Sequence, residues 1–134
     1  MDTDALIRQR VQEYFVEGDH NCAMTALKVL SEIFEVPLEP QVIDAASSLP
    51  GAGGTGELCG LVSGTLMFIG VWGRRKGFHR EAFEPVAKGF TEGVHERLGS
   101  VRCEALESDG CGALAEEVLI FAAAHLAREW GVAG

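Results

Sequence analysis

The stretch from Gly51 to Lys76 constrains the fold more than any other part of the chain. It reads GAGGTGELCGLVSGTLMFIGVWGRRK, a glycine-rich turn, then Cys59, then the most apolar run in the sequence. On a helix these apolar residues would occupy every face, which is typical of a helix surrounded by other helices. The sequence therefore predicts an all-α fold, a compact bundle of five to six helices around a buried central helix that contains glycines.

Two small residues on this central helix indicate close packing. Gly60 and Gly64 are four residues apart, so they share a face on which another backbone could approach closely. Each glycine costs about 1 kcal/mol relative to alanine inside a helix, and close packing is a reason to keep it. A membrane span is the rival interpretation, but only 16 residues separate the start at Leu58 from the end at Gly73. About 20 are needed, so we expect a buried core helix and no membrane span.

Helical periodicity continues through the rest of the chain. No linker, repeat or low-complexity segment interrupts residues 1–134, so we expect a single helical domain. Five other helices are expected. The first carries Ile7, Val11, Tyr14 and Phe15 and ends at Gly18, and the second is capped by Asp19-His20-Asn21 and stopped by Pro37. The remaining three run from Pro40 to Leu49, from about His79 to Leu98 with Gly99 closing it, and from about Cys111 to Trp130 with His125 on its apolar side.

Charge and cysteine content narrow the function. The chain has 11 basic and 20 acidic residues, a net charge of −9, which argues against a nucleic-acid partner. The N-terminus MDTDALIRQR lacks the basic and apolar regions of a secretory signal, so we expect a cytoplasmic protein. Lasting disulfides are uncommon there, so four cysteines indicate metal ligands or redox thiols. The alternative is four buried small hydrophobic side chains.

The cysteines fall at informative positions. Cys22, Cys59 and Cys111 lie at the predicted starts of helices, where unsatisfied N–H groups and the helix dipole favour thiolate over thiol. Cys103 lies in a connection, eight residues before Cys111. A loop of that length can bring its two ends together, as metal ligands or as a disulfide.

These cysteine contexts resemble a known family. Asn21-Cys22-Ala23, the segment GAGGTGELCG before an apolar helix, Gly99-Ser100-Val101-Arg102-Cys103 and finally Cys111 are similar, in order, to the C-GCAxxG-C-C family of redox-active proteins. Asn21 and Ala26 depart from it, because they stand where the family name would place glycines. The resemblance implies an all-α domain with a redox or metal role. The chain has no C-x-x-C-H segment, so it encodes no haem attachment.

The leading hypothesis is one site built from four thiolates that holds an iron–sulfur cluster, most simply [2Fe–2S], for electron transfer. There are two alternatives. One is a metal-free redox protein with reversible disulfides, Cys103 with Cys111 and Cys22 with Cys59. The other is a structural or binding helical domain whose cysteines hold zinc or are inert. Separations of 37, 44 and 8 residues form no metal-binding knuckle, so only the fold could assemble such a site. The candidate residues are Cys22, Cys59, Cys103 and Cys111 as ligands or redox thiols, Asn21, Gly54, Gly56 and Gly60 as backbone support, and His20 and Glu57 around them.

Other chemistry has weaker support. GAGGTG matches the glycine pattern of a dinucleotide site, but no predicted strand precedes it, and no Lys-Ser/Thr follows it as in a phosphate-binding loop. His20 could also be a solvated residue of a capping loop. The sequence carries no hydrolase or transferase signature and leaves open an oxidoreductase or an electron carrier. It implies an unidentified redox partner protein, and a homodimer is left open.

Overall fold

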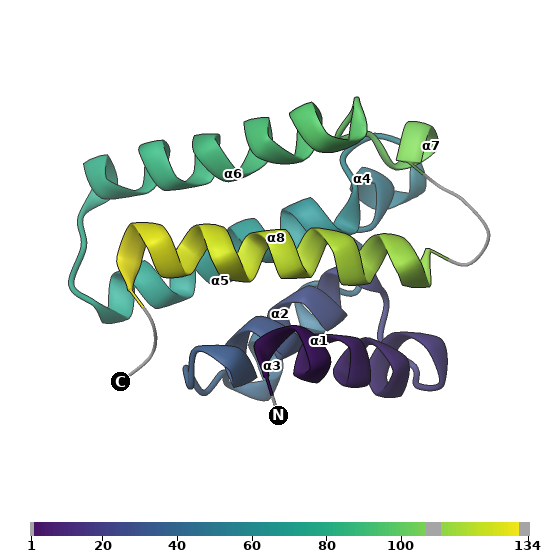
Figure 1. The fold of residues 1–134 in the computed structure, drawn as a ribbon, viewed down its shortest axis with the longest axis horizontal. Coiled ribbons are helices and arrows are strands. Elements are labelled where there is room, and N and C mark those ends of the chain that lie inside the picture. Colours follow the sequence, from purple (N-terminus) through teal and green to yellow (C-terminus); the bar gives the residue numbers. More distant parts are fainter. Residues whose placement is uncertain (1, 107–110, 132–134) are drawn as a thin grey trace.

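A computed structural model describes residues 2–106 and 111–131, and within these ranges the chain is helical without a strand (Figure 1). The predicted all-α fold is therefore confirmed. The elements are α1 (Thr3–Val11), a π-helical turn η1 (Gln12–Val16), α2 (Cys22–Ile33), α3 (Pro40–Asp44), α4 (Gly51–Gly54), α5 (Gly60–Arg75), a 3₁₀ turn η2 (Arg80–Ala82), α6 (Phe83–Leu98), α7 (Cys103–Leu106) and α8 (Gly112–Trp130).

Helix α5 is the predicted central helix. It packs against α2, α6 and α8, and every residue from 60 to 73 is buried or half-buried. Phe68, Ile69 and Trp72 are buried in the core, where the ring of Trp72 packs at a tilt against that of Phe34, the residue after α2, with 4.5 Å between ring centroids. In the described part of the chain, none of the helices combines the length and apolar character needed to cross a bilayer.

The glycines of α5 allow the close approach that the sequence predicted. A Cβ atom at Gly64 would overlap the carbonyl oxygen of Ala23 on α2 and would lie 2.9 Å from its Cα. A backbone cannot move away as a flexible side chain can, so only glycine fits at this crossing. The crossing fixes how α2 and α5, and the cysteines at their starts, lie relative to one another.

The glycine-rich stretch before α5 forms a left-handed helical turn. Four consecutive residues of α4 have positive φ: Gly51 at 63°, Ala52 at 52°, Gly53 at 78° and Gly54 at 85°. Hydrogen bonds from the amides of Gly54 and Thr55 to the carbonyls four residues earlier close it as a short left-handed turn. Glycine adopts this conformation without steric cost, which explains its abundance here.

Several predicted boundaries were wrong by a few residues. The helix expected from Pro40 to Leu49 ends at Asp44. After it the backbone hydrogen bonds span three residues, and the side-chain amide of Asn21 donates hydrogen bonds to the carbonyls of Ala46 and Ser47. The helix expected from His79 begins at Phe83, after the 3₁₀ turn η2. The first helix changes to π-helical geometry at Gln12 before it ends at Val16.

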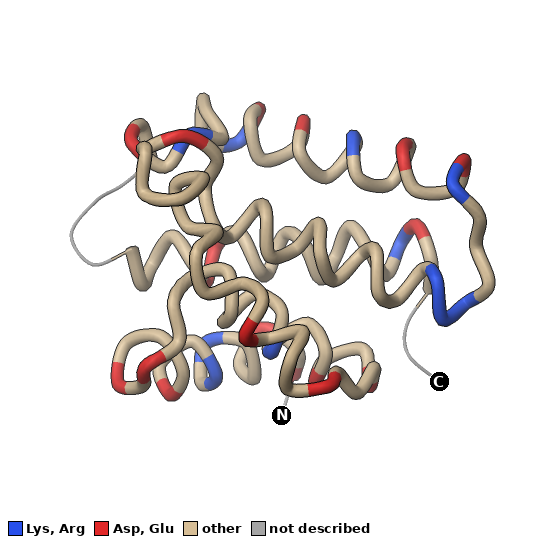
Figure 2. Tube along the Cα trace, turned by 180° about the vertical axis from the view of Figure 1, so that it is seen from behind, with Lys and Arg blue, Asp and Glu red and all other residues tan. Residues whose placement is uncertain are grey.

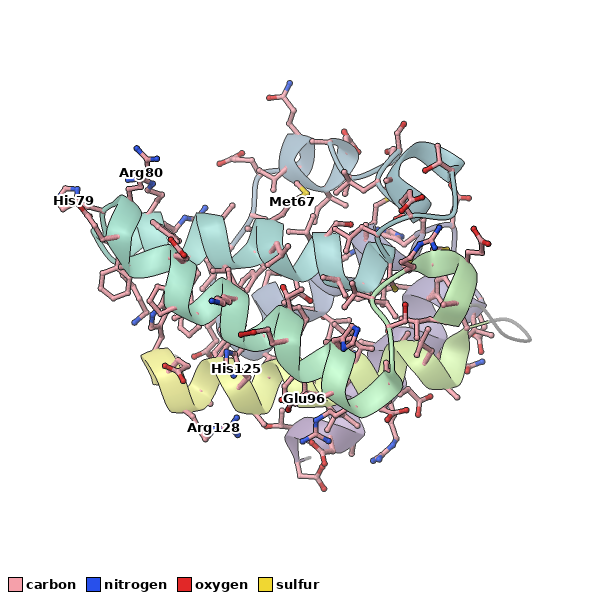
Figure 3. All side chains as sticks on the ribbon, turned by 90° about the horizontal axis from the view of Figure 1, so that it is seen from above. Met67, His79, Arg80, Glu96, His125 and Arg128 are labelled. Carbon is pink, nitrogen blue, oxygen red and sulfur yellow. The ribbon has the colours of Figure 1, made fainter. Side chains whose placement is uncertain are left out.

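The helix ends that carry cysteine gather at one end of the bundle. Figure 1 shows the beginnings of α2, α5 and α8 together with α4 and α7 at the same end. The opposite end holds an aromatic cluster in which Trp72, Phe78 and Phe83 pack around Trp130. His125 is not at the cysteine end. It points from α8 toward α6 (Figure 3), where its Nε2 lies 3.1 Å from the carbonyl of Val86, as expected for a core histidine.

Candidate functional site

Each of the four cysteines stands at the beginning of a helix. Cys22 is the first residue of α2, Cys103 is the first of α7, and Cys59 and Cys111 are the residues that immediately precede α5 and α8. The sequence predicted this for three of them and left Cys103 in a connection, because the single turn of α7 is too short to give a periodic pattern. Cys111 has a positive φ of 55°.

Asn21 and Gly60 determine the position of Cys22. The Oδ1 of Asn21 accepts a hydrogen bond from the amide of Met24 at 2.8 Å, so Asn21 is the predicted helix cap. The sulfur of Cys22 occupies the space that a Cβ atom at Gly60 would fill. Gly60 therefore lets the Cys22 thiol lie directly against the first turn of α5, next to Cys59.

Two short extended segments bring Cys59 and Cys103 together. Leu58 and Arg102 form an isolated antiparallel bridge. The amide of Cys59 donates to the carbonyl of Val101 at 2.8 Å, and the amide of Cys103 donates to the carbonyl of Glu57 at 2.5 Å. A third bond, from Glu104 to Gly56 at 3.0 Å, extends the pairing. We call the paired segments 56–59 and 101–104 the clasp.

An arginine side chain joins the two segments of the clasp on its solvent side. Nη2 of Arg102 lies 3.1 Å from Oε1 of Glu57 and 3.5 Å from Oε2 of Glu104. All three side chains are more than half exposed, and Figure 2 shows basic and acidic positions next to each other in this region. Sequence analysis missed Arg102 and Glu104, because nothing in the sequence indicates that residues 57 and 102 are neighbours.

Burial is the main influence on the acidity of Cys22 and Cys59. Burial, together with the charges of nearby Cys59 and Cys103, raises the pKa of Cys22 from 9.0 to about 11, although the amide of Ala23 acts in the opposite direction. Burial also raises the pKa of Cys59, against hydrogen bonds from the amides of Leu61 and Val62. The expectation that the helix starts make these two thiols anionic was therefore wrong. The helix amides are present as predicted, but the loss of solvent outweighs them.

The charge of Cys59 is coupled to the charges of the other three cysteines. It raises the pKa of Cys22, and Cys103 and Cys111 in turn raise its own pKa, so its charge interacts with all three other thiols. The structure thus brings the four cysteines into one electrostatic neighbourhood. Among the residues that the structure describes, no three His, Cys, Asp or Glu side chains are arranged as a ready-made metal site. The roles of these cysteines stay predictions.

The other predicted residues have definite places. His20 packs its ring against Tyr14, with 5.6 Å between centroids. Glu57 uses its carboxylate for Arg102 and its carbonyl for Cys103, so it belongs to the clasp. Gly56 also belongs to the clasp, and a Cβ atom there would lie 2.9 Å from the carboxylate of Glu104. Gly54 is the last residue of the left-handed turn, whose first residue, Gly51, borders Cys103.

Comparison with known proteins agrees with this arrangement. Residues 20–126 match the model of the family described as "Putative redox-active protein (C_GCAxxG_C_C)". The chain belongs to this family. The matched region begins just before the cap of α2 and ends within α8, so it contains all four cysteines and the clasp. No curated protein and no solved structure matches the chain.

Proposed function

We propose that the four cysteines form one site that holds an iron–sulfur cluster and transfers electrons. Membership of a family described as redox-active supports a redox role for the chain. The cluster is our addition to that role. The observation that carries it is the clasp, because it holds Cys59 beside Cys103 while Cys59 also interacts electrostatically with Cys22 and Cys111.

The geometry of the clasp favours ligands over a direct disulfide between its two cysteines. Cys59 is paired with Val101, and Cys103 is paired with Glu57, so the two cysteines are diagonal neighbours on the same side of an antiparallel pair. Diagonal Cβ atoms in such a pair are about 7–8 Å apart, or somewhat less. A disulfide needs about 3.5–4.5 Å between Cβ atoms, whereas two thiolates of one cluster can be further apart.

The chemistry of the donor set fits a cluster. Four cysteine thiolates are the usual ligands of [2Fe–2S] and [4Fe–4S] clusters, and Cys22, Cys59, Cys103 and Cys111 would supply them. The cluster would supply the capacity to accept and release single electrons. The chain would contribute burial and the amides of Ala23, Leu61 and Val62, which donate toward the sulfurs of Cys22 and Cys59 and stabilise negative charge there.

The raised thiol pKa values are compatible with this proposal. Buried thiols that repel one another when charged keep their protons at neutral pH, and a bound cation removes that repulsion because it replaces the protons. The same property slows thiol–disulfide exchange, since the thiolate is the attacking species. Zinc held by the same four thiolates would satisfy the charges equally well, but it would not transfer electrons.

A metal-free dithiol protein is the second candidate. It is favoured by the lack of a ready-made group of three metal-binding side chains among the described residues. In this alternative two thiols lose two protons and two electrons to an oxidant, such as a disulfide of a partner protein, and form a disulfide that a dithiol reductant later returns to thiols.

Metal analysis distinguishes these candidates. Protein purified without oxygen is assayed for iron, acid-labile sulfide and zinc, with a visible spectrum of the same sample. The cluster predicts about two irons and two sulfides per chain and absorption between about 400 and 550 nm. Colourless protein with one zinc would replace the cluster with a structural metal. Colourless protein without metal, whose thiols oxidise reversibly in pairs, would favour the dithiol candidate.

A further inference from the structure

We infer that Arg102 is a positioning residue for this site, because its ion pairs close the clasp and thereby help to hold Cys103 beside Cys59. The inference rests on the proposed function. It adds a residue whose charge, outside the ligand set, stabilises the closed clasp and so favours the position of Cys103 that the site needs. It also makes the site sensitive to ionic strength.

The pairing of the clasp places Cys103. Segments 101–104 and 56–59 are joined by three backbone hydrogen bonds, which the amides of Cys59, Cys103 and Glu104 donate. The α7 turn that follows Cys103 has only four residues, and α7 makes no extensive contact with another helix in the described part of the chain. The clasp therefore contributes to the position of Cys103, together with Gly51 of α4, which borders the Cys103 side chain.

The ion pairs of Arg102 are the part of the clasp that a side chain controls. Arg102 contacts Glu57 on the opposite segment and Glu104 on its own, so it links residues that are 45 positions apart in the sequence. Its own amide donates to the hydroxyl of Ser100 at 3.0 Å, which orients the backbone just before the bridge. Without the guanidinium, Glu57 and Glu104 would be two carboxylates with no cation between them.

Because the ion pairs of Arg102 are exposed to solvent, their contribution to the closed clasp is small and depends on the salt concentration. Exposed ion pairs contribute little each, and salt screens them. We expect the clasp to loosen at high ionic strength in the wild type. A variant without the guanidinium should have a loose clasp at every salt concentration.

The chain offers a matched control. Arg8 forms an exposed ion pair with Glu116 at 3.5 Å between α1 and α8. Replacing it removes an ion pair of the same kind but leaves the clasp intact. Arg102→Ala and Arg8→Ala are therefore compared, and Arg102→Lys keeps the positive charge while it loses the planar fork of the guanidinium.

The first readout needs no metal. In reduced, metal-free protein, hydrogen exchange at the amides of Cys59, Cys103 and Glu104 reports whether the clasp is closed. We expect exchange about 5- to 25-fold faster in Arg102→Ala, the limit set by two exposed ion pairs, with partial recovery in Arg102→Lys and no change in Arg8→Ala. Equal exchange in Arg102→Ala and Arg8→Ala would overturn the inference.

The second readout reports the sulfurs directly and uses Co²⁺ as the probe. Thiolate-to-cobalt charge transfer grows as the sulfurs bind, so its rise during a Co²⁺ titration measures the affinity of the four-thiolate site. We expect wild type and Arg8→Ala to bind Co²⁺ with equal affinity, and Arg102→Ala to bind it up to about 5- to 25-fold more weakly. Equal affinity in Arg102→Ala and Arg8→Ala would refute the positioning role. If wild-type protein bound no cobalt, the proposed metal site would fail, and the exchange data alone would decide the role of Arg102.

Discussion

Replacing Gly64 with alanine should destabilise the protein although alanine favours helix formation. The new Cβ would overlap the Ala23 carbonyl oxygen and lie 2.9 Å from the Ala23 Cα, so α2 and α5 must separate. Overpacking of this kind costs typically 1–3 kcal/mol, and contact with backbone places it at the upper end, about 3 kcal/mol. Alanine returns about 1 kcal/mol of helix propensity. The expected net loss in free energy of unfolding is about 2 kcal/mol.

Gly70 provides the control on the same helix. A Cβ atom there would meet no atom within 4 Å, so Gly70→Ala should gain the propensity alone and stabilise by about 1 kcal/mol. Urea denaturation followed by circular dichroism measures both variants. The two should differ by about 3 kcal/mol. If Gly64→Ala were as stable as Gly70→Ala, α2 and α5 would not cross where we place them, and the proximity of Cys22 to Cys59 would lose its support.

Three further predictions concern backbone strain and pH. Ala52→Gly should stabilise by up to about 1 kcal/mol and Gly53→Ala should destabilise by about 1–2 kcal/mol, both measured by denaturation, because these positions have positive φ. The free energy of unfolding of metal-free reduced protein should not change with the ionisation of Cys22 below pH 9, where this thiol is protonated in both states. It should fall by about 1–2 kcal/mol as the pH rises through the folded pKa of Cys22, about 11. Cys22→Ser should flatten this part of the pH–stability curve. Burial, followed by the hydrogen bond that its hydroxyl donates to Glu32, raises the pKa of Tyr14 from 10.0 to about 12. Tyr14→Phe should therefore reduce the loss of stability between those pH values, by about 1 kcal/mol after allowance for solvent screening. An unchanged alkaline curve in either variant would contradict the corresponding shift.

The sequence predicted features that depend on local chemistry and periodicity. The all-around apolar pattern identified α5 as the central helix, and Gly60 and Gly64 predicted its close contact, which is made with α2. Asn21 was recognisable as a cap because its residue type and position suit that role. These signals lie within a few residues of one another, which is why they can be read without a structure.

Features that depend on tertiary contacts escaped prediction. The clasp joins Leu58 and Arg102, 44 positions apart, through an isolated bridge, which has no alternating pattern to reveal it. The acidity of Cys22 and Cys59 was misjudged because the helix amides can be inferred from sequence, whereas the extent of burial cannot. The sequence predicted a glycine-rich turn here but not its left-handed geometry, because the glycines permit positive φ without requiring four such residues in succession.

Redox titration of wild type and Cys59→Ser tests the central claim most directly. Cys59 interacts electrostatically with all three other cysteines, so a single redox site should depend on it. Protein purified without oxygen is titrated against redox mediators while its visible spectrum is recorded. Our account predicts one reversible one-electron transition in the wild type, with colour, iron and transition all lost or strongly reduced in Cys59→Ser. An unchanged transition in Cys59→Ser, or none in the wild type, would contradict it.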